Sequence, residues 1–193
     1  KNTCKFILKI YYTNLTMKDH VILVSSEDKS IGYMEKIEAH QKGLLHRAIS
    51  VFILNEREEM LIQRRALSKY HTPGVWSNTA CSHPRKNETT MQAAKRRLNE
   101  EMGLKAPLNY GFKFLYKAEF KNGLIEHELD HVFFGFSNEK PSINISEVCD
   151  YKYLDQGKIE TMILQQPENF SPWFKLTYKL SLIHISEPTR LGA

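Results

Sequence analysis

The chain has 193 residues, of which 41% are hydrophobic and 25% charged, a composition that predicts one globular domain with a substantial core. Its three cysteines (Cys4, Cys81 and Cys149) are widely spaced and odd in number, which argues against a disulfide framework and indicates a reducing, cytoplasmic compartment. The net charge of +5 comes from scattered lysines and arginines. Without a basic stripe between stacking aromatics, this charge favours a small anionic ligand and no nucleic-acid partner. No apolar run approaches the roughly 18 residues that span a bilayer, so we expect no membrane partner.

The two ends of the chain do not share the patterns of its middle. Residues 1–16 precede Met17, a natural start, and carry no cleavage pattern of a signal peptide. We therefore expect residues 1–16 to be a non-native or disordered extension, 17–180 to form the domain, and 181–193 to be a non-native tail.

The predicted elements begin with two strands. Apolar runs at 49–55 and 60–65 predict strands, the first buried on both faces, around a charged turn. Residues 67–76 contain Pro-Gly and predict a loop. A helix is expected from about Thr89 to Met102, with Gly103 as its stop. Its apolar stripe consists of Met91, Ala94, Leu98 and Met102.

A strictly alternating segment follows at 110–120 and predicts a half-buried strand. We expect one face to carry Tyr110, Phe112, Phe114, Tyr116, Ala118 and Phe120. The rest of the chain predicts a turn at 122–123, strands at 126–136 and 150–155, a helix at 156–165 and a closing helix begun by Ser171 and Pro172. Strands, helix, strands and helices in this order predict an α+β domain.

Several acidic and histidine residues are candidates for a metal site. Glu126 and Glu128 project from one face of a strand, and Asp130 continues that face. One interpretation is a solvent-facing row of charge. The other adds imidazoles, which together with carboxylates suit Mn²⁺, Zn²⁺ or Mg²⁺. His40 and His46 would need a folded loop to converge. The full set has five ligands: His40, His46, His83, Glu126 and Glu128.

The stretch "NTACSHPRKNE" places Cys81 two residues before His83. A free cysteine is usually a small buried hydrophobe, and a nearby histidine is often a surface residue. Alternatively, the two side chains belong to a reactive site. The pair alone does not decide between these interpretations.

The segment Arg96–Gly103 is equally open when it is taken alone. Its arginines and glutamates are i,i+4 pairs, which is typical of an exposed helix face. The spacing also resembles the second half of a Nudix box, a helix that presents glutamates to a metal bound to a diphosphate. Glu88 stands at the first glutamate position of the box, Ser82 replaces its opening glycine, and Arg97 replaces one glutamate.

Larger motifs resemble one family. In order, "HRAISVFILN", "LIQRRALSKYHTPGVWSNTACSHP", "RRLNEEMG", "EHE" and "FSPW" resemble type 1 isopentenyl-diphosphate delta-isomerases of the Nudix superfamily, from about His20 to Leu180. The resemblance implies a Nudix-type α+β fold, a mixed sheet sandwiched by helices. It also implies isomerisation of isopentenyl diphosphate to dimethylallyl diphosphate by an allylic proton transfer.

The resemblance also implies roles for individual residues. It makes Cys81 and Glu128 the acid–base pair, with Tyr116 and Trp173 around the hydrocarbon end. It makes the five-ligand set the site of one tightly bound divalent metal, Mn²⁺, Zn²⁺ or Mg²⁺. Glu101, with the backbone carbonyl of Cys81, would contact a Mg²⁺ brought with the diphosphate. The implied diphosphate-binding residues are Lys36, Arg65, Lys69 and Arg97.

Two alternatives remain beside the isomerase: a Nudix pyrophosphohydrolase and a non-catalytic metal-binding module. Arg97 in place of a glutamate and the Cys81-x-His83 pair argue against the hydrolase. Turnover would separate the isomerase from the non-catalytic module. For the isomerase we expect a small diphosphate as the partner and a monomer, with a dimer as the alternative.

Overall fold

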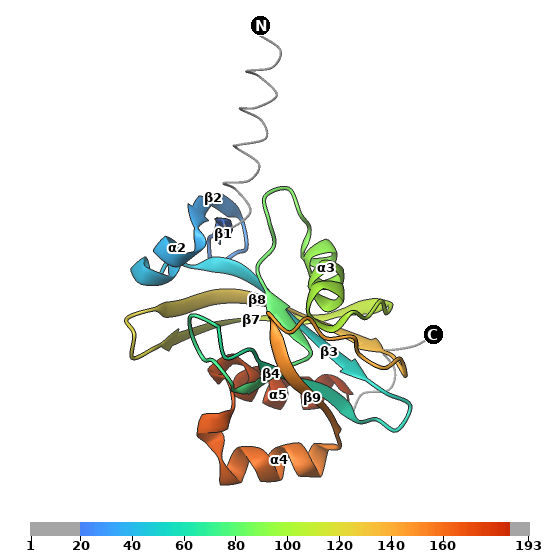
Figure 1. Ribbon diagram of the computed structural model, residues 1–193. Coiled ribbons are helices and arrows are strands. Elements are labelled where there is room, and N and C mark those ends of the chain that lie inside the picture. The colour runs from blue at the N-terminus through green and yellow to red at the C-terminus, as the bar shows by residue number, and fades with distance from the viewer. Residues whose placement is uncertain (1–19, 186–193) are drawn as a thin grey trace, which may run out of the picture.

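A computed structural model describes residues 20–185 and arranges them around one mixed sheet (Figure 1). Its centre is the pair of strands β3 (His46–Leu54) and β8 (Ile125–Phe136), which run parallel with His46 beside Glu128. The other strand pairs among the described residues are antiparallel. The predicted mixed sheet is confirmed, and its one parallel pair brings a histidine and a glutamate together.

The remaining elements surround this pair. The other strands are β1 (His20–Val24), β2 (Ser30–Glu35), β4 (Met60–Arg65), β5 (Trp76–Ser77), β6 (Ala80–Ser82), β7 (Leu108–Glu119) and β9 (Val148–Leu154). The helices are α2 (Lys36–Lys42), α3 (Thr90–Met102), α4 (Gln156–Gln165) and α5 (Pro172–Ile185), with a 3₁₀ turn at Pro167–Asn169. The hairpin β1–β2 and helix α2 were not predicted from the sequence. The described residues contain no helix long and apolar enough to cross a membrane.

Helices cover both faces of the sheet, as predicted. Ile49, Val51 and Ile53 of β3 belong to one core cluster with the apolar stripe of α3. Phe52, on the opposite face of β3, packs in a second cluster with α4 and α5, where its ring stacks on Phe174 at 6.2 Å. Because side chains alternate along a strand, the continuous apolar run of β3 supplies both cores.

Helix α3 begins and ends at sequence signals. Thr89 caps it, accepting a hydrogen bond from Gln92 N while the Gln92 side chain accepts from Thr89 N. Gly103 ends it in the left-handed region at φ 66°. The helix therefore holds Arg97 and Glu101 in fixed positions one turn apart.

The alternation predicted for β7 is wrong at Tyr110. A β-bulge shifts the register between Tyr110 and Phe112, at Gly111, where a Cβ would stand 2.4 Å from Cε2 of Phe134. Tyr110 consequently lies against Phe133 on the other face and is half exposed. The other five residues of the predicted face do share one core cluster.

Helix α5 extends past the predicted domain boundary. Ser171 accepts a hydrogen bond from Phe174 N at 3.3 Å, as expected for an N-cap. The helix continues to Ile185, and Ser181 is fully buried. The predicted boundary after residue 180 therefore falls inside a helix. The predicted extension 1–16 lies outside the described residues.

Candidate functional site

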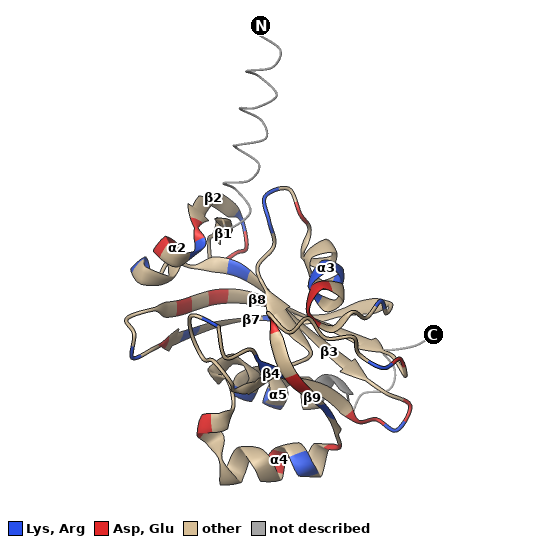
Figure 2. Ribbon diagram, in the orientation of Figure 1, with Lys and Arg blue, Asp and Glu red and all other residues tan. Residues whose placement is uncertain are grey.

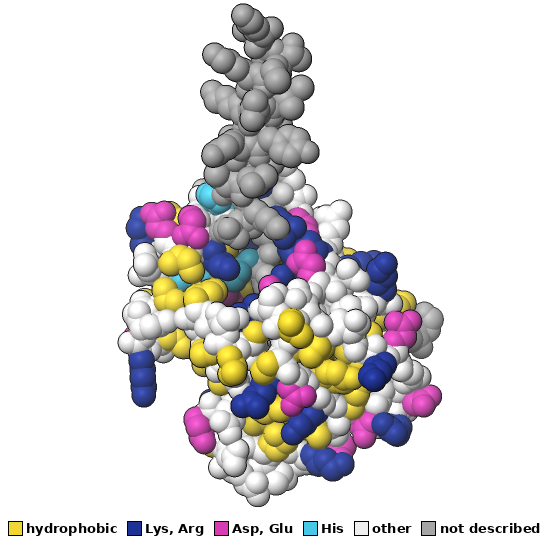
Figure 3. All heavy atoms as spheres, viewed as in Figure 1, with side chains coloured by type: hydrophobic (Ala, Val, Ile, Leu, Met, Phe, Trp, Pro, Cys, Tyr) yellow, Lys and Arg dark blue, Asp and Glu magenta, His cyan; other side chains and the backbone are white. Residues whose placement is uncertain are grey.

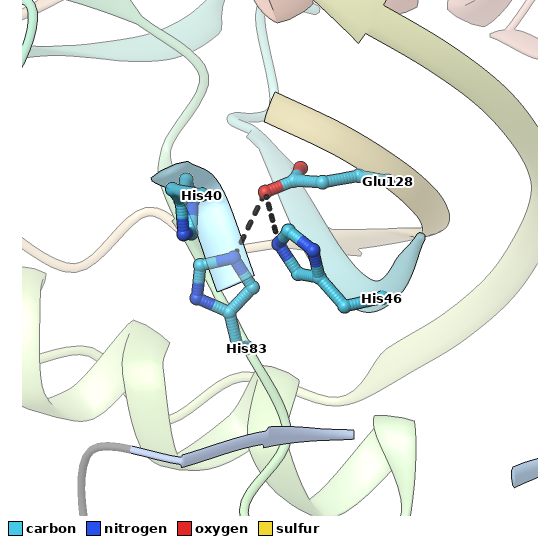
Figure 4. Close-up of side chains that lie close together, drawn as sticks. All are labelled: His40, His46, His83 and Glu128. Carbon is cyan, nitrogen blue, oxygen red and sulfur yellow. Dashed lines mark hydrogen bonds and ion pairs between the residues drawn. The ribbon is translucent and has the colours of Figure 1, made fainter. Parts of the chain in front are cut away.

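Four side chains from four segments converge beside the parallel strand pair (Figure 4). His40 lies on α2, whose left-handed end at Gly43 turns the chain so that His46 begins β3. The two imidazoles are 4.7 Å apart between ring centroids, and His83 follows β6 with its ring 4.9 Å from that of His46. With Glu128 they offer ligand atoms that all lie within 4.8 Å of one another. We call His40, His46, His83 and Glu128 the four-ligand group.

The chemistry of this group fits a divalent cation. The Nδ1 atoms of His40 and His46 donate to the backbone carbonyls of Lys36 at 2.6 Å and Leu44 at 2.7 Å. Their Nε2 atoms, which therefore carry lone pairs, are buried and accept no hydrogen bond from any residue that the structure describes. His46 Nε2 lies 3.4 Å from a Glu128 oxygen. A metal-bound histidine typically donates a hydrogen bond from its other ring N–H to a carbonyl in this way. A cation would satisfy both orphaned lone pairs.

Glu126 lies beside the four-ligand group rather than within it. Its carboxylate forms a second cluster of candidate ligand atoms with His40 and His71. Its Oε2 lies 3.1 Å from Tyr116 Oη, and its Oε1 lies 3.0 Å from His71 Nε2. The predicted five ligands are therefore neighbours, and His71 is a sixth candidate that sequence reasoning missed. The sequence indicated His71 only through its place in the loop of the stretch "LIQRRALSKYHTPGVWSNTACSHP".

The row of acidic residues on β8 does not face solvent. Glu126, Glu128 and Asp130 are 3%, 6% and 1% exposed, so the solvent-facing interpretation of this row is wrong. Burial and the charge of Glu128 raise the pKa of Glu126 well above its usual range. Burial also opposes ionisation of Glu128, but the hydrogen bond from His83 and the neighbouring His46 ring outweigh it and hold its pKa well below its usual range.

Burial also keeps the histidines neutral. Burial lowers the pKa of His40 to about 4, assisted by repulsion from His46. It lowers the pKa of His83 to about 3, against the hydrogen bond to Glu128. Burial and the neighbouring Arg65 guanidinium lower the pKa of His71 to about 4. At neutral pH these imidazoles are uncharged, which is the form that binds metals.

Cys81 lies on β6, paired with Ser50 of β3. Burial, with the nearby Glu101 charge, raises the pKa of its thiol to about 12, so the thiol keeps its proton at neutral pH. Arg65 Nη1 lies 3.9 Å from the sulfur. Tyr116 is buried and donates from Oη to Glu128 Oε2. Trp173 is 3% exposed, and its indole N–H has no hydrogen-bond partner within residues 20–185.

Most predicted site residues line a single cavity of about 380 Å³. The predicted residues in its wall are Lys36, Arg65, Lys69, Cys81, His83, Arg97, Tyr116, Glu126, Glu128 and Trp173. His40, His46 and Glu101 are buried and lie outside this lining. Figure 3 shows histidine side chains at the floor of a hollow, with basic side chains beside it. The structure thus brings the predicted set together around one hollow.

The basic residues of the cavity already contact partners within the protein. Lys36 Nζ lies 4.9 Å from the Tyr70 ring, and the Arg65 guanidinium lies 5.1 Å from the Trp173 ring. Lys69 forms an ion pair with Glu147. These contacts hold the cations of Lys36, Arg65 and Lys69 at the wall of the cavity.

Helix α3 presents arginines and glutamates side by side (Figure 2). Arg97 binds Glu101 at 2.8 Å and also reaches Glu147 at 2.8 Å, so the predicted i,i+4 pair is present. Glu101 is buried and accepts a second hydrogen bond from Gln63 Nε2 at 2.6 Å. The contacts of Glu147 and Gln63 with this helix were not predicted, because both residues lie far from it in the sequence.

The comparisons with known proteins agree with this fold. The NUDIX domain family matches residues 44–174, so the chain is a NUDIX-domain protein. A crystal structure of a Deinococcus radiodurans protein shares the fold, with a TM-score of 0.63 over 76% of this chain and 89% of that chain at 18% identity.

Curated relatives narrow the class. The isopentenyl-diphosphate Delta-isomerase of Pectobacterium atrosepticum is 52% identical over 158 residues, 82% of this chain and 88% of the relative. Isopentenyl-diphosphate Delta-isomerase 2 of Aromatoleum aromaticum is 48% identical over 157 residues, 81% of this chain and 83% of the relative. The chain belongs to the isopentenyl-diphosphate Delta-isomerase family.

Proposed function

We propose that the protein converts isopentenyl diphosphate to dimethylallyl diphosphate by moving a proton across the allylic unit. The observation that carries the proposal is that Cys81 and Glu128 line the same cavity, which also contains basic side chains and an aromatic wall. Membership in the isomerase family supports the substrate.

The proposed chemistry needs an acid, a base and a dry site. Protonating an unactivated alkene creates a tertiary carbocation, which water would capture. We assign the acid–base roles to Glu128 and Cys81. The thiol of Cys81 is protonated at neutral pH, and the carboxylate of Glu128 receives a hydrogen bond from Tyr116. Tyr116 can therefore hold or pass a proton at Glu128 Oε2.

The aromatic wall suits the cationic intermediate. The π face of Trp173 attracts a cation, by about 2 kcal/mol or more when the site is desolvated. In this structure the Arg65 guanidinium already lies over that ring, at 5.1 Å. We propose that Trp173 borders the hydrocarbon end and that its burial excludes water from the cation.

We propose that the four-ligand group together with Glu126 holds one tightly bound divalent cation, Mn²⁺, Zn²⁺ or Mg²⁺. Such a cation would neutralise the buried carboxylates and fix their orientation. We propose that Glu101, with the backbone carbonyl of Cys81, contacts a Mg²⁺ that arrives with the diphosphate, since Mg²⁺ commonly joins a carboxylate to substrate phosphates.

The diphosphate is proposed to bind Lys36, Arg65, Lys69 and Arg97, whose cationic groups suit phosphate oxygens. Arg97 also argues against hydrolysis. A hydrolase of this fold needs several glutamates on the helix to hold metals, whereas here Arg97 replaces one of them and Glu100 pairs with Arg97. The diphosphate therefore anchors the substrate and is not cleaved in the proposed reaction. We keep a cytoplasmic location and a monomer as further expectations.

Incubation of the purified chain with isopentenyl diphosphate and Mg²⁺ tests the proposal. Dimethylallyl diphosphate should accumulate until the two isomers reach equilibrium, as followed by NMR. A chain that binds metal and folds but yields no product would reject the isomerase and favour the non-catalytic module.

A further inference from the structure

His71 is buried between Glu126, a proposed metal ligand, and Arg65, a proposed diphosphate-binding residue. It lies in the loop between β4 and β5 and is 6% exposed. Its ring stacks on Phe120 with centroids 5.4 Å apart and planes 19° apart, and lies 5.9 Å from the Trp173 ring. These aromatic contacts fix the orientation of the imidazole.

The hydrogen bonds of His71 assign its proton. Arg65 Nη2 lies 3.2 Å from His71 Nδ1. A guanidinium can only donate, so Nδ1 accepts from it, and the Thr72 hydroxyl, 3.3 Å from Nδ1, can donate to the same nitrogen. An accepting Nδ1 leaves the ring proton on Nε2. Nε2 lies 3.0 Å from Glu126 Oε1, where it donates to an oxygen of the carboxyl group.

This polarity decides between two interpretations of the cluster formed by His40, His71 and Glu126. As a second metal site, the cluster would need a lone pair on His71 Nε2. The bond from Arg65 places a proton there instead. His71 is therefore a partner of a metal-ligand candidate and not a ligand itself.

We propose that His71 is a positioning residue that bridges Arg65 to Glu126 and so fixes the metal side of the site relative to the diphosphate side. The inference rests on the roles proposed above for Arg65 and Glu126. A hydrogen-bonding partner that orients a ligating carboxylate typically changes metal affinity by about 10- to 100-fold when it is removed. We therefore expect removal of the His71 imidazole to change metal affinity by about the same factor.

Two variants separate the hydrogen bonds of His71 from its packing. His71→Phe keeps an aromatic ring between Phe120 and Trp173 but removes both polar contacts. His71→Gln keeps one acceptor for Arg65 and one donor for Glu126. His131→Phe is the matched control, because His131 is 7% exposed and its Nε2 also lies 3.0 Å from a carboxylate, that of Asp28.

Metal affinity is measured with Co²⁺ as the probe, by chelator competition and by visible absorption. His71→Phe should bind Co²⁺ about 10- to 100-fold more weakly with an altered spectrum, and should raise KM for isopentenyl diphosphate. His71→Gln should stay within about threefold of the wild type, as should His131→Phe. Wild-type affinity and spectrum in His71→Phe would overturn the bridge, and so would failure of His71→Gln to restore them. Two Co²⁺ ions per wild-type chain, falling to one in His71→Phe, would make His71 a ligand and also overturn it.

A measurement on the wild-type chain covers the case in which a variant does not fold. Long-range ¹H–¹⁵N NMR of the imidazole should show His71 protonated at Nε2 and bare at Nδ1. The opposite tautomer would overturn the proposal. Neither this readout nor Co²⁺ binding needs turnover, so a chain that fails to isomerise would reject the proposed function while leaving the bridge testable.

Discussion

Glu88 stands where a Nudix box has its first glutamate, but its contacts in this structure are to the protein. Arg96 donates to both of its oxygens, from Nε at 2.7 Å and from Nη2 at 2.8 Å, and the backbone N–H of Arg85 donates at 2.8 Å. Arg96 Nη2 also donates to the carbonyl of His83 at 3.2 Å. The Glu88–Arg96 pair therefore anchors the loop that carries a proposed metal ligand.

Glu88→Gln should destabilise the fold by about 2 kcal/mol at pH 7. Hydrogen bonds to charged groups contribute about 1.5–3 kcal/mol, and the two side chains are only 15% and 17% exposed, which limits solvent screening. For a chain of this size the loss corresponds to a fall in Tm of about 4–8 °C. Glu168→Gln, at an exposed position, serves as the control and should change stability by less than about 0.5 kcal/mol.

The effect should depend on pH with a definite sign. Burial alone would raise the pKa of Glu88, but the bonds from Arg96 and Arg85 outweigh it and lower the pKa. A depressed folded-state pKa gives stability that is complete above the unfolded value, near about 4.3, and is lost as pH falls through the folded value. Urea denaturation should therefore show a constant difference between wild type and Glu88→Gln from pH 7 to about 5, shrinking below about 4. A difference that is independent of pH, or under about 0.5 kcal/mol at pH 7, refutes this account.

Three further perturbations test the site and its frame. Cys81→Ala should lower isomerisation by several orders of magnitude without a loss of fold, and near-normal turnover, measured by NMR, would make the assigned role wrong. His83→Ala should lose bound metal, measured by elemental analysis after dialysis, whereas stoichiometric metal in that variant would reject the proposed ligand set. Gly103→Ala should cost at least about 2 kcal/mol in urea denaturation, because φ is 66° and a Cβ would stand 2.6 Å from Ser142 O; an unchanged midpoint would show that the helix end adapts.

The sequence predicted the elements with strong local signals. The strand at 60–65 and the helix at 156–165 have the predicted limits, and Thr89 and Gly103 bound α3 as expected. Tyr110 was misplaced because a β-bulge adds a residue to one strand of a pair, and the periodicity of that strand alone does not encode it. The strand β2 is as long as β4 but has no buried residue, so it offers no apolar run that would have revealed the hairpin β1–β2.

Prediction of the site depended on resemblance more than on local pattern. No helical spacing joins His40 to His46, and it is the turn at Gly43 that brings them together. His71 lies 55 positions before Glu126, so their contact follows only from the tertiary fold. Local pattern also left Arg97 open between an exposed ion pair and a ligand helix, and the structure shows an ion pair that is largely buried.

Isomerisation in D₂O tests the central claim most directly. Proton transfer that leaves the diphosphate intact should place deuterium from solvent in the newly formed methyl group of dimethylallyl diphosphate, seen by NMR, with no phosphate or pyrophosphate released. Rapid release of phosphate or pyrophosphate without incorporation of deuterium would contradict the account and establish hydrolysis instead.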